Sequence, residues 1–152
     1  APAMHFKNKT LATWLAFLGG PMGLHRFYLH GLGDTLGWLH PIPTALGLWG
    51  VERMRMLGQD DVLSWLLIPL LGFTVAATCL TAIVYALTDI ERWNRRHQPQ
   101  APDSPAGRTS GLTIVALALA LLTGTGALMA SLAFSFQHYF EYQIEEARKI
   151  SQ

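Results

Sequence analysis

The chain has 152 residues, a net charge of +1 and a single cysteine, and 51% of its residues are hydrophobic while 14% are charged. The near-zero net charge argues against a nucleic-acid partner, and a single cysteine excludes an internal disulfide or a cysteine-based zinc framework. Since soluble domains carry about 25% charged residues, the composition favours a membrane protein. We therefore expect an all-α fold, an integral membrane bundle of three to four transmembrane helices with a helical C-terminal tail.

Four apolar segments follow one another along the chain. Residues 11–24 form a short segment, and residues 32–51 form a longer one that is interrupted by polar residues and prolines. Residues 62–88 and 111–136 are runs of 27 and 26 residues without a charged side chain. Each exceeds the roughly 20 residues that cross a bilayer as a helix. The last two segments therefore predict transmembrane helices, to which the first two add one or two more.

A run at residues 19–29 joins small residues to an aromatic and basic cluster, in the order Gly-Gly-Pro-Met-Gly-Leu-His-Arg-Phe-Tyr-Leu. Glycine removes the side chain where two helices cross, so Gly19, Gly20 and Gly23 are candidate helix-packing residues. Pro21 favours a helix end or a tight turn instead, and we prefer the turn.

The candidate site within this motif consists of His25, Arg26, Phe27, Tyr28 and Asp34. A charged side chain in hydrocarbon is costly and is by default a functional candidate. The flanking aromatic residues favour an arginine at headgroup level, with its stem along apolar surface. A third interpretation is an ion pair between Arg26 and Asp34, which would satisfy both charges.

Residues 7–29 resemble the TM-2 domain family, small two-helix membrane proteins whose bacterial members are often labelled NINE proteins. The resemblance rests on Lys7, Lys9, the apolar residues 11–18, the three glycines of the motif and the residues His-Arg-Phe-Tyr-Leu. The chain departs from the family at His30, where the family usually has glycine, and at the following His-Pro-Ile-Pro interruption. The resemblance implies a turn on the cytoplasmic side and implies no reaction.

No enzyme, metal or cofactor is expected. Metal-binding imidazoles usually occur in spaced sets with carboxylates or cysteines, whereas His25 and His30 are five residues apart, and His40 and His138 are isolated in sequence. We interpret the histidines as residues at the membrane–water interface. The alternative hypothesis is that His40 ligates the metal of a haem or a chlorophyll. No nucleophile–base pair or intramembrane carboxylate pair is visible in the sequence.

Residues 93–110 are expected to form an exposed, flexible linker, because three prolines punctuate a polar stretch. The linker divides the chain into residues 1–92, a TM-2-like membrane region with an additional helix, and residues 111–152, a transmembrane helix with an amphipathic tail. Four crossings would divide Lys and Arg six to five between the two sides. The cluster at residues 92–96 then favours a cytoplasmic linker, with both termini outside.

The final segment carries two further candidate surfaces. Ala116, Ala120 and Gly124 repeat at four-residue spacing, which gives a smooth face for a neighbouring helix of this chain or another. In the tail, Phe136, Tyr139, Phe140 and Ile144 recur at three- and four-residue steps, as on an amphipathic helix. The tail either continues the helix out of the membrane or forms a docking surface for a partner.

These features predict a non-enzymatic, multi-pass protein of the bacterial inner (cytoplasmic) membrane. In this hypothesis the chain is an accessory or scaffold subunit of a larger membrane complex, respiratory or photosynthetic. Its expected partners are the lipid bilayer and other membrane-protein subunits or a second copy of itself. The alternative hypothesis is a homo-oligomeric channel or transporter component.

Overall fold

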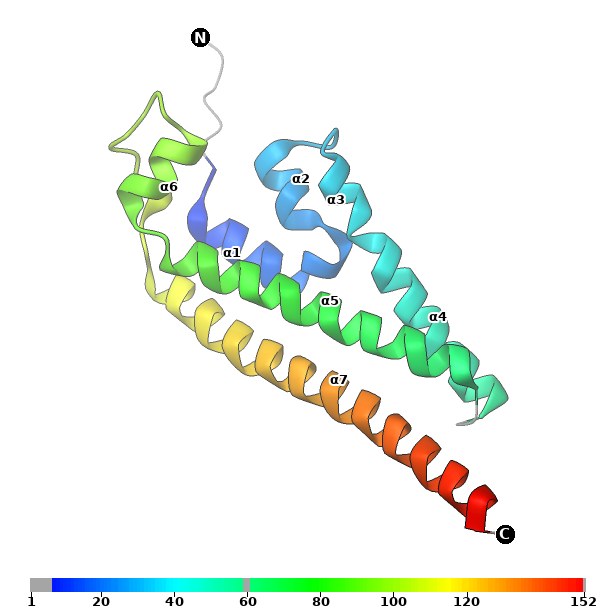
Figure 1. Ribbon diagram of the computed structural model, residues 1–152. Coiled ribbons are helices and arrows are strands. Elements are labelled where there is room, and N and C mark those ends of the chain that lie inside the picture. Colours follow the sequence, from blue (N-terminus) through cyan, green and yellow to red (C-terminus); the bar gives the residue numbers. More distant parts are fainter. Residues whose placement is uncertain (1–6, 59–60, 152) are drawn as a thin grey trace.

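The computed structural model describes residues 7–58 and 61–151, and within these ranges the protein is all helical, as predicted (Figure 1). The elements in chain order are α1 (Lys9–Leu18), η1 (Gly20–Met22), α2 (Leu24–His30), α3 (Thr35–Leu39), α4 (Pro41–Leu57), α5 (Val62–Leu87), α6 (Ile90–His97), η2 (Pro105–Gly107) and α7 (Gly111–Ser151).

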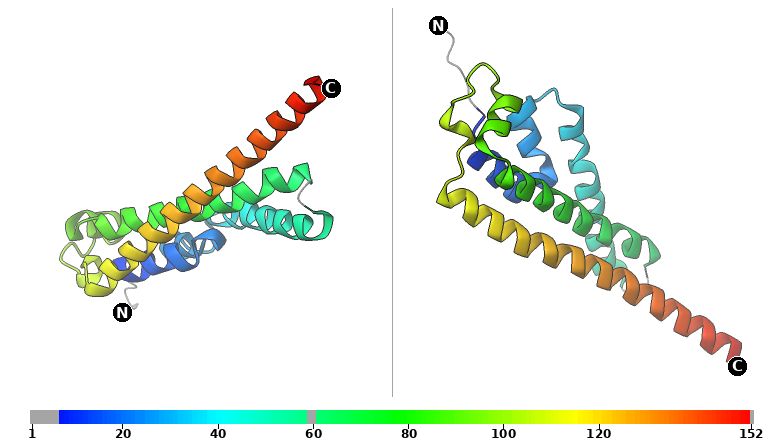
Figure 2. Two further views of the ribbon diagram at one scale, coloured as in Figure 1. Left: turned by 90° about the horizontal axis from the view of Figure 1, so that it is seen from below. Right: turned by 60° about the vertical axis from the view of Figure 1, so that its left-hand side comes forward.

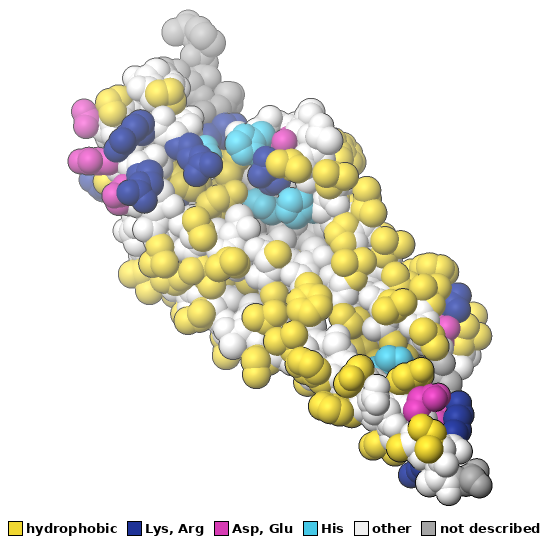
Figure 3. Space-filling view, in the orientation of Figure 1, with side chains coloured by type: hydrophobic (Ala, Val, Ile, Leu, Met, Phe, Trp, Pro, Cys, Tyr) yellow, Lys and Arg dark blue, Asp and Glu magenta, His cyan; other side chains and the backbone are white. Residues whose placement is uncertain are grey.

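Two long antiparallel helices form the frame of the molecule. α5 has 26 residues and α7 has 41, which correspond to lengths of about 39 and about 60 Å. Both are long and apolar enough to cross a membrane, yet only 22% of the most apolar window of each is buried within the protein. The core helix of a soluble protein would be mostly buried. Here the apolar side chains instead cover the outside of the molecule (Figure 3).

Along α5, the helices α1 and α4 follow one another end to end (Figures 1 and 2). Glycines make both contacts close: Gly20, after α1, meets the side chain of Thr78, and Gly47 of α4 meets Leu71. Between α1 and α4, the chain forms α2 and α3, which project away from α5 before α4 returns to it (Figure 1). The short first apolar segment therefore covers only part of α5, since the 10 residues of α1 rise about 15 Å.

The turn that ends α1 is built from glycine and proline. Gly23 has φ +76°, a left-handed conformation that side-chain-bearing residues rarely adopt, and a Cβ there would collide with the backbone carbonyl oxygen of Gly37. The backbone of the turn is hydrogen-bonded: the Gly19 amide donates to Leu15, and the Thr44 hydroxyl donates to the Pro21 carbonyl at 2.7 Å. The chain can therefore reverse here without leaving these groups unpaired.

The two ends of the molecule are chemically distinct. At one end, Lys9 is fully buried, and its ammonium donates to the Thr88 carbonyl at 2.7 Å and to the Thr109 hydroxyl at 2.5 Å. The start of α1 is thereby held against the end of α5 and the start of α7. The end of α4, the start of α5 and the end of α7 lie at the opposite end (Figure 1). The described chain therefore begins and ends at opposite ends of the molecule, because it reverses after α1.

The segment predicted to be an exposed linker is buried at some positions and exposed at others. It contains α6, and the indole of Trp93 is 1% exposed and donates to the Lys7 carbonyl at 2.7 Å. Asn94 is fully buried, and its amide donates to the carbonyls of Pro102 and Ser104 at 3.0 and 2.8 Å. The three prolines are exposed, while the chain curves around the buried asparagine.

Candidate functional site

The Gly–Arg–aromatic motif folds into a hairpin of α2 and α3 held by an ion pair. Arg26 Nε donates to Asp34 Oδ2 at 2.6 Å, and both side chains are half-buried. The same carboxylate oxygen accepts from the Gly37 amide and caps α3. The Arg26 guanidinium holds the pKa of the Asp34 carboxyl below its usual range. Of the three interpretations of Arg26, the structure contains the ion pair.

The aromatic residues of the motif point in two directions. Phe27 packs on Trp38 of α3, with ring centroids 4.9 Å apart, and so closes the hairpin. Tyr28 faces the other way, where its hydroxyl accepts from the Asn8 amide at 2.8 Å and its carbonyl accepts from the Lys7 ammonium at 2.9 Å. The motif therefore joins the hairpin to the residues that precede α1.

Tertiary packing brings together histidines that are separate in sequence. His25 is 1% exposed and meets His40 with ring centroids 5.2 Å apart, and its Nδ1 has no hydrogen-bond partner among the described residues. The ring centroids of His30 and His97 are 6.4 Å apart, and His138 stacks on Trp65 with ring centroids 4.1 Å apart. His40 is therefore not isolated. No group of three or more potential metal ligands occurs within residues 7–58 and 61–151.

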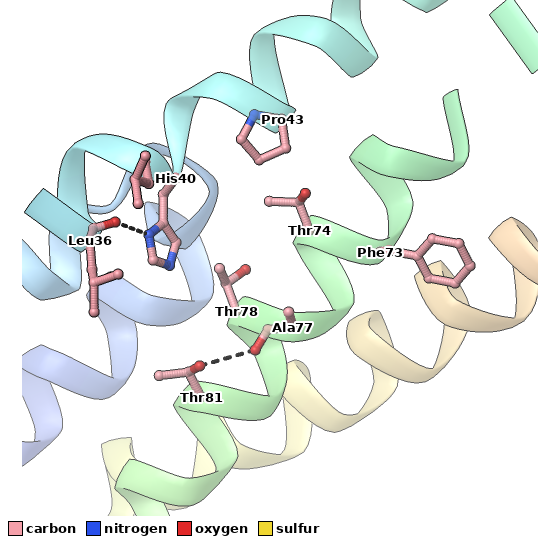
Figure 4. Close-up of a pocket in the computed structure, with 9 residues that line it drawn as sticks. Leu36, His40, Pro43, Phe73, Thr74, Ala77, Thr78 and Thr81 are labelled. Atoms are coloured by element: carbon pink, nitrogen blue, oxygen red, sulfur yellow. Dashed lines mark hydrogen bonds between the residues drawn. The ribbon is translucent and has the colours of Figure 1, made fainter. Parts of the chain in front are cut away.

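A cleft of about 360 Å³ separates α3 and α4 from α5. In Figure 4, His40 projects from the start of α4 toward Thr78, and its Nδ1 lies 2.7 Å from the Leu36 carbonyl. Because a carbonyl only accepts, Nδ1 donates. The hydroxyls of Thr74, Thr78 and Thr81 donate to carbonyls of their own helix. The cleft thus presents methyl groups around one imidazole, which suits an apolar chain better than a polar substrate.

A second cavity, of about 220 Å³, lies at the end of the molecule that carries α6. Its lining comes from α2, α5 and α6, and consists of Arg26, His30, Val84, Tyr85, Thr88, Trp93, Arg96 and His97. None of these residues is acidic. Burial, together with the positive charges of Arg96, His30 and Lys7, lowers the pKa of His97 to about 4. We call this the cationic cavity.

The predicted small-residue stripe on α7 is used inside this chain. Ala116 and Ala120 are fully buried, and Ala120 packs with Ala16 of α1 and Cys79 of α5. A Cβ at Gly124 would lie 2.7 Å from the Cβ of Cys79. The stripe therefore sets the distance between α5 and α7.

The predicted docking face of the tail turns away from the rest of the molecule. Phe134 and His138 stack on Trp65 of α5. At 3.6 residues per turn, the residues Phe136, Tyr139, Phe140 and Ile144 fall on the opposite face of α7, and each is more than half exposed. We call these four residues the tail face.

Tyr85, Trp93 and His97 of the cationic cavity have no role in the sequence analysis, and Arg96 enters it only through the basic cluster at residues 92–96. Trp93, Arg96 and His97 lie in the segment predicted to be an exposed linker. A tryptophan is large and apolar and is highly buried on average, so Trp93 together with His97 four residues later could have indicated a packed helix.

In comparisons with known proteins, no family model, no curated protein and no solved structure matches this chain.

Proposed function

We propose that the chain is a multi-pass protein of the bacterial inner membrane with three crossings and one re-entrant hairpin. The crossings are α5, α7 and the combined length of α3 and α4. Helices α1 and α2 enter the membrane and return to the same side. The 23 residues from 35 to 57 are about 35 Å long, enough for a core of about 30 Å. The hydrogen bonds of the glycine turn support the re-entrant hairpin, because lipid tolerates irregular backbone only where it is satisfied within protein.

The distribution of basic residues supports an orientation. Seven of the eleven Lys and Arg residues lie at the end that carries α6, namely Lys7, Lys9, Arg26, Arg92, Arg95, Arg96 and Arg108, and four lie at the other end (Figure 3). Cytoplasmic ends of membrane proteins carry the excess of Lys and Arg. We therefore place α6 and the N-terminal side in the cytoplasm and the C-terminus outside.

Cysteine labelling tests this topology. Cys79 is the single cysteine and is 1% exposed, so it should not react with the maleimide, and any labelling reports the introduced cysteine. We expect Ser151→Cys to react with a membrane-impermeant maleimide in intact spheroplasts, and Gln100→Cys to react only after permeabilisation. Reaction of both variants from the same side would contradict three crossings.

Within this membrane, we propose a non-enzymatic accessory role, in which the chain packs against other subunits of a larger complex, such as a respiratory or photosynthetic one. The single observation that carries this proposal is the tail face, whose aromatic and aliphatic side chains project from the side of α7 that does not contact α5. α7 also extends beyond the rest of the chain (Figure 2). An exposed apolar stripe on a helix is the form in which helices bind hydrophobic grooves of partners.

Native mass spectrometry of gently solubilised membranes tests the accessory role. We expect the wild-type chain to be found with other subunits in fixed stoichiometry and Phe140→Ser to be released, because truncating an interfacial aromatic costs about 2 kcal/mol or more. Tyr142→Ser is the matched control, since Tyr142 is 55% exposed against 60% for Phe140 but lies off the tail face. A wild-type chain that is always alone would contradict the proposal, and ionic currents from the pure protein in planar bilayers would favour a channel.

A further inference from the structure

From the cationic cavity we infer a binding site for the phosphate group of an anionic glycerophospholipid in the cytoplasmic leaflet. The inference rests on the proposed membrane placement of the chain, and it does not depend on the proposed partner.

The charge of the cavity is positive and only partly compensated. Arg26 shares its charge with Asp34 through the 2.6 Å ion pair. Arg96 is exposed and has neither an ion pair nor a hydrogen bond among the described residues. Lys7 lies close enough to His97 to act on its charge. Guanidinium groups form paired, charge-assisted hydrogen bonds with phosphate oxygens, so one phosphate would supply the missing negative charge.

Aromatic rings give the cavity rigid walls. The rings of Tyr85 and Trp93 pack edge-on with their centroids 5.5 Å apart, and the rings of Trp93 and His97 have centroids 4.3 Å apart. The ring of His97 also contacts the ring of His30, with the ring centroids 6.4 Å apart. The Trp93 indole is itself fixed by its hydrogen bond to the Lys7 carbonyl. The imidazoles therefore add hydrogen-bonding groups beside the two arginines, whereas the Thr88 hydroxyl already donates to the Val84 carbonyl.

The position of the cavity favours a lipid over a soluble phosphate. The cavity lies where α5 ends and α6 begins, which is the proposed boundary between membrane and cytoplasm. Its wall includes Val84, which is 54% exposed on the outside of α5. A lipid whose phosphate occupies the cavity could therefore leave its acyl chains along the apolar outer surface. The cytoplasmic leaflet is also the leaflet whose surface is negatively charged.

Lipid titration into the purified full chain in neutral detergent, read by native mass spectrometry, tests the site. We expect one phosphatidylglycerol to be retained per chain about tenfold more tightly than phosphatidylcholine. Arg96→Gln should remove about tenfold of that affinity, as expected for a lost hydrogen bond between charged groups. Arg95→Gln is the matched control, because it removes the same charge from a neighbouring exposed position of α6 but does not line the cavity. It should change the affinity by less than about twofold.

A second measurement separates binding at the cavity from general attraction. The imidazole resonances of His97 should shift when phosphatidylglycerol is added, and those of His138, at the other end of the molecule, should not. His30→Gln serves as a second variant in case Arg96→Gln does not fold, and it should also weaken retention.

Three results would overturn the inference. Equal losses in Arg95→Gln and Arg96→Gln would indicate diffuse charge attraction. Inorganic phosphate that binds as tightly as phosphatidylglycerol would assign the site to a soluble anion. Absence of lipid preference in a chain that remains in the membrane fraction would reject the site while leaving the proposed function intact. A chain found in the soluble fraction would instead overturn the proposed membrane placement itself.

Discussion

Replacing Gly124 by alanine tests how closely α5 and α7 approach one another. The added Cβ would lie 2.7 Å from the Cβ of Cys79, whereas carbon atoms in contact lie about 3.5–4.0 Å apart. Relief requires the two helices to separate by a large part of an ångström, and overpacking of this kind costs about 1–3 kcal/mol. Alanine gains about 0.5–1 kcal/mol over glycine in a helix. We therefore expect a net destabilisation of about 1–2 kcal/mol, measured by unfolding in mixed micelles with circular dichroism.

The neighbouring glycine is the matched control. A Cβ at Gly126 meets nothing within 4 Å, so Gly126→Ala receives only the helix-propensity gain and should stabilise the protein by about 0.5–1 kcal/mol. The two alanine variants should therefore differ in sign.

Substitutions of Cys79 locate the collision. Cys79→Gly removes the Cβ that the new methyl group meets, so it should recover about 1 kcal/mol or more of coupling energy in a double-mutant cycle with Gly124→Ala. Cys79→Ala keeps that Cβ and should recover little. Equal stability of the two alanine variants at positions 124 and 126, or equal rescue by both cysteine variants, would refute the close-contact reasoning.

Three further predictions use the same unfolding measurement. Gly23→Ala should destabilise the protein by at least about 2 kcal/mol, since it combines left-handed strain with a backbone collision, whereas Gly33→Ala, in open space, should change stability by less than about 0.5 kcal/mol. Because the pKa of Asp34 is lowered from 3.8, its ion pair should stabilise the fold above that pH, and this stabilisation should be lost as the pH falls below it. Asp34→Asn should therefore make the stability depend less on pH in the acid range. An unchanged dependence in that range would contradict the prediction. Trp65→Ala should cost about 3 kcal/mol by removing the stack on Phe134 and His138, and a loss below about 1 kcal/mol would show that these rings do not hold α7.

The sequence predicted local features well where one short stretch carries all the information. The uncharged runs became α5 and α7, because length and apolar content suffice to select long helices. Pro21 and its flanking glycines were enough to favour a turn over a helix crossing. The ion pair between Arg26 and Asp34 was one of three open interpretations, and only the fold selects it.

Longer-range features were missed because they depend on segments far apart in the chain. Three prolines suggested an exposed linker, and these prolines are exposed. The burial of Trp93 and Asn94 within the same segment depends on contacts with Lys7 and with residues 102–104, which the local pattern does not show. The cationic cavity likewise joins α2 to α6, which are more than 60 residues apart, so no local motif could have indicated it.

The amino-acid sequence alone determined the helical class, the two long apolar helices and the reversal at the glycines, since these follow from hydrophobic content and backbone freedom within a few turns of chain. The tertiary structure decided which end each segment occupies, which glycines and alanines face α5, and which basic side chains share a cavity. The reason is that a ten-residue helix followed by a turn can pack in more than one direction, and only its contacts with α5 and α7 select the observed one.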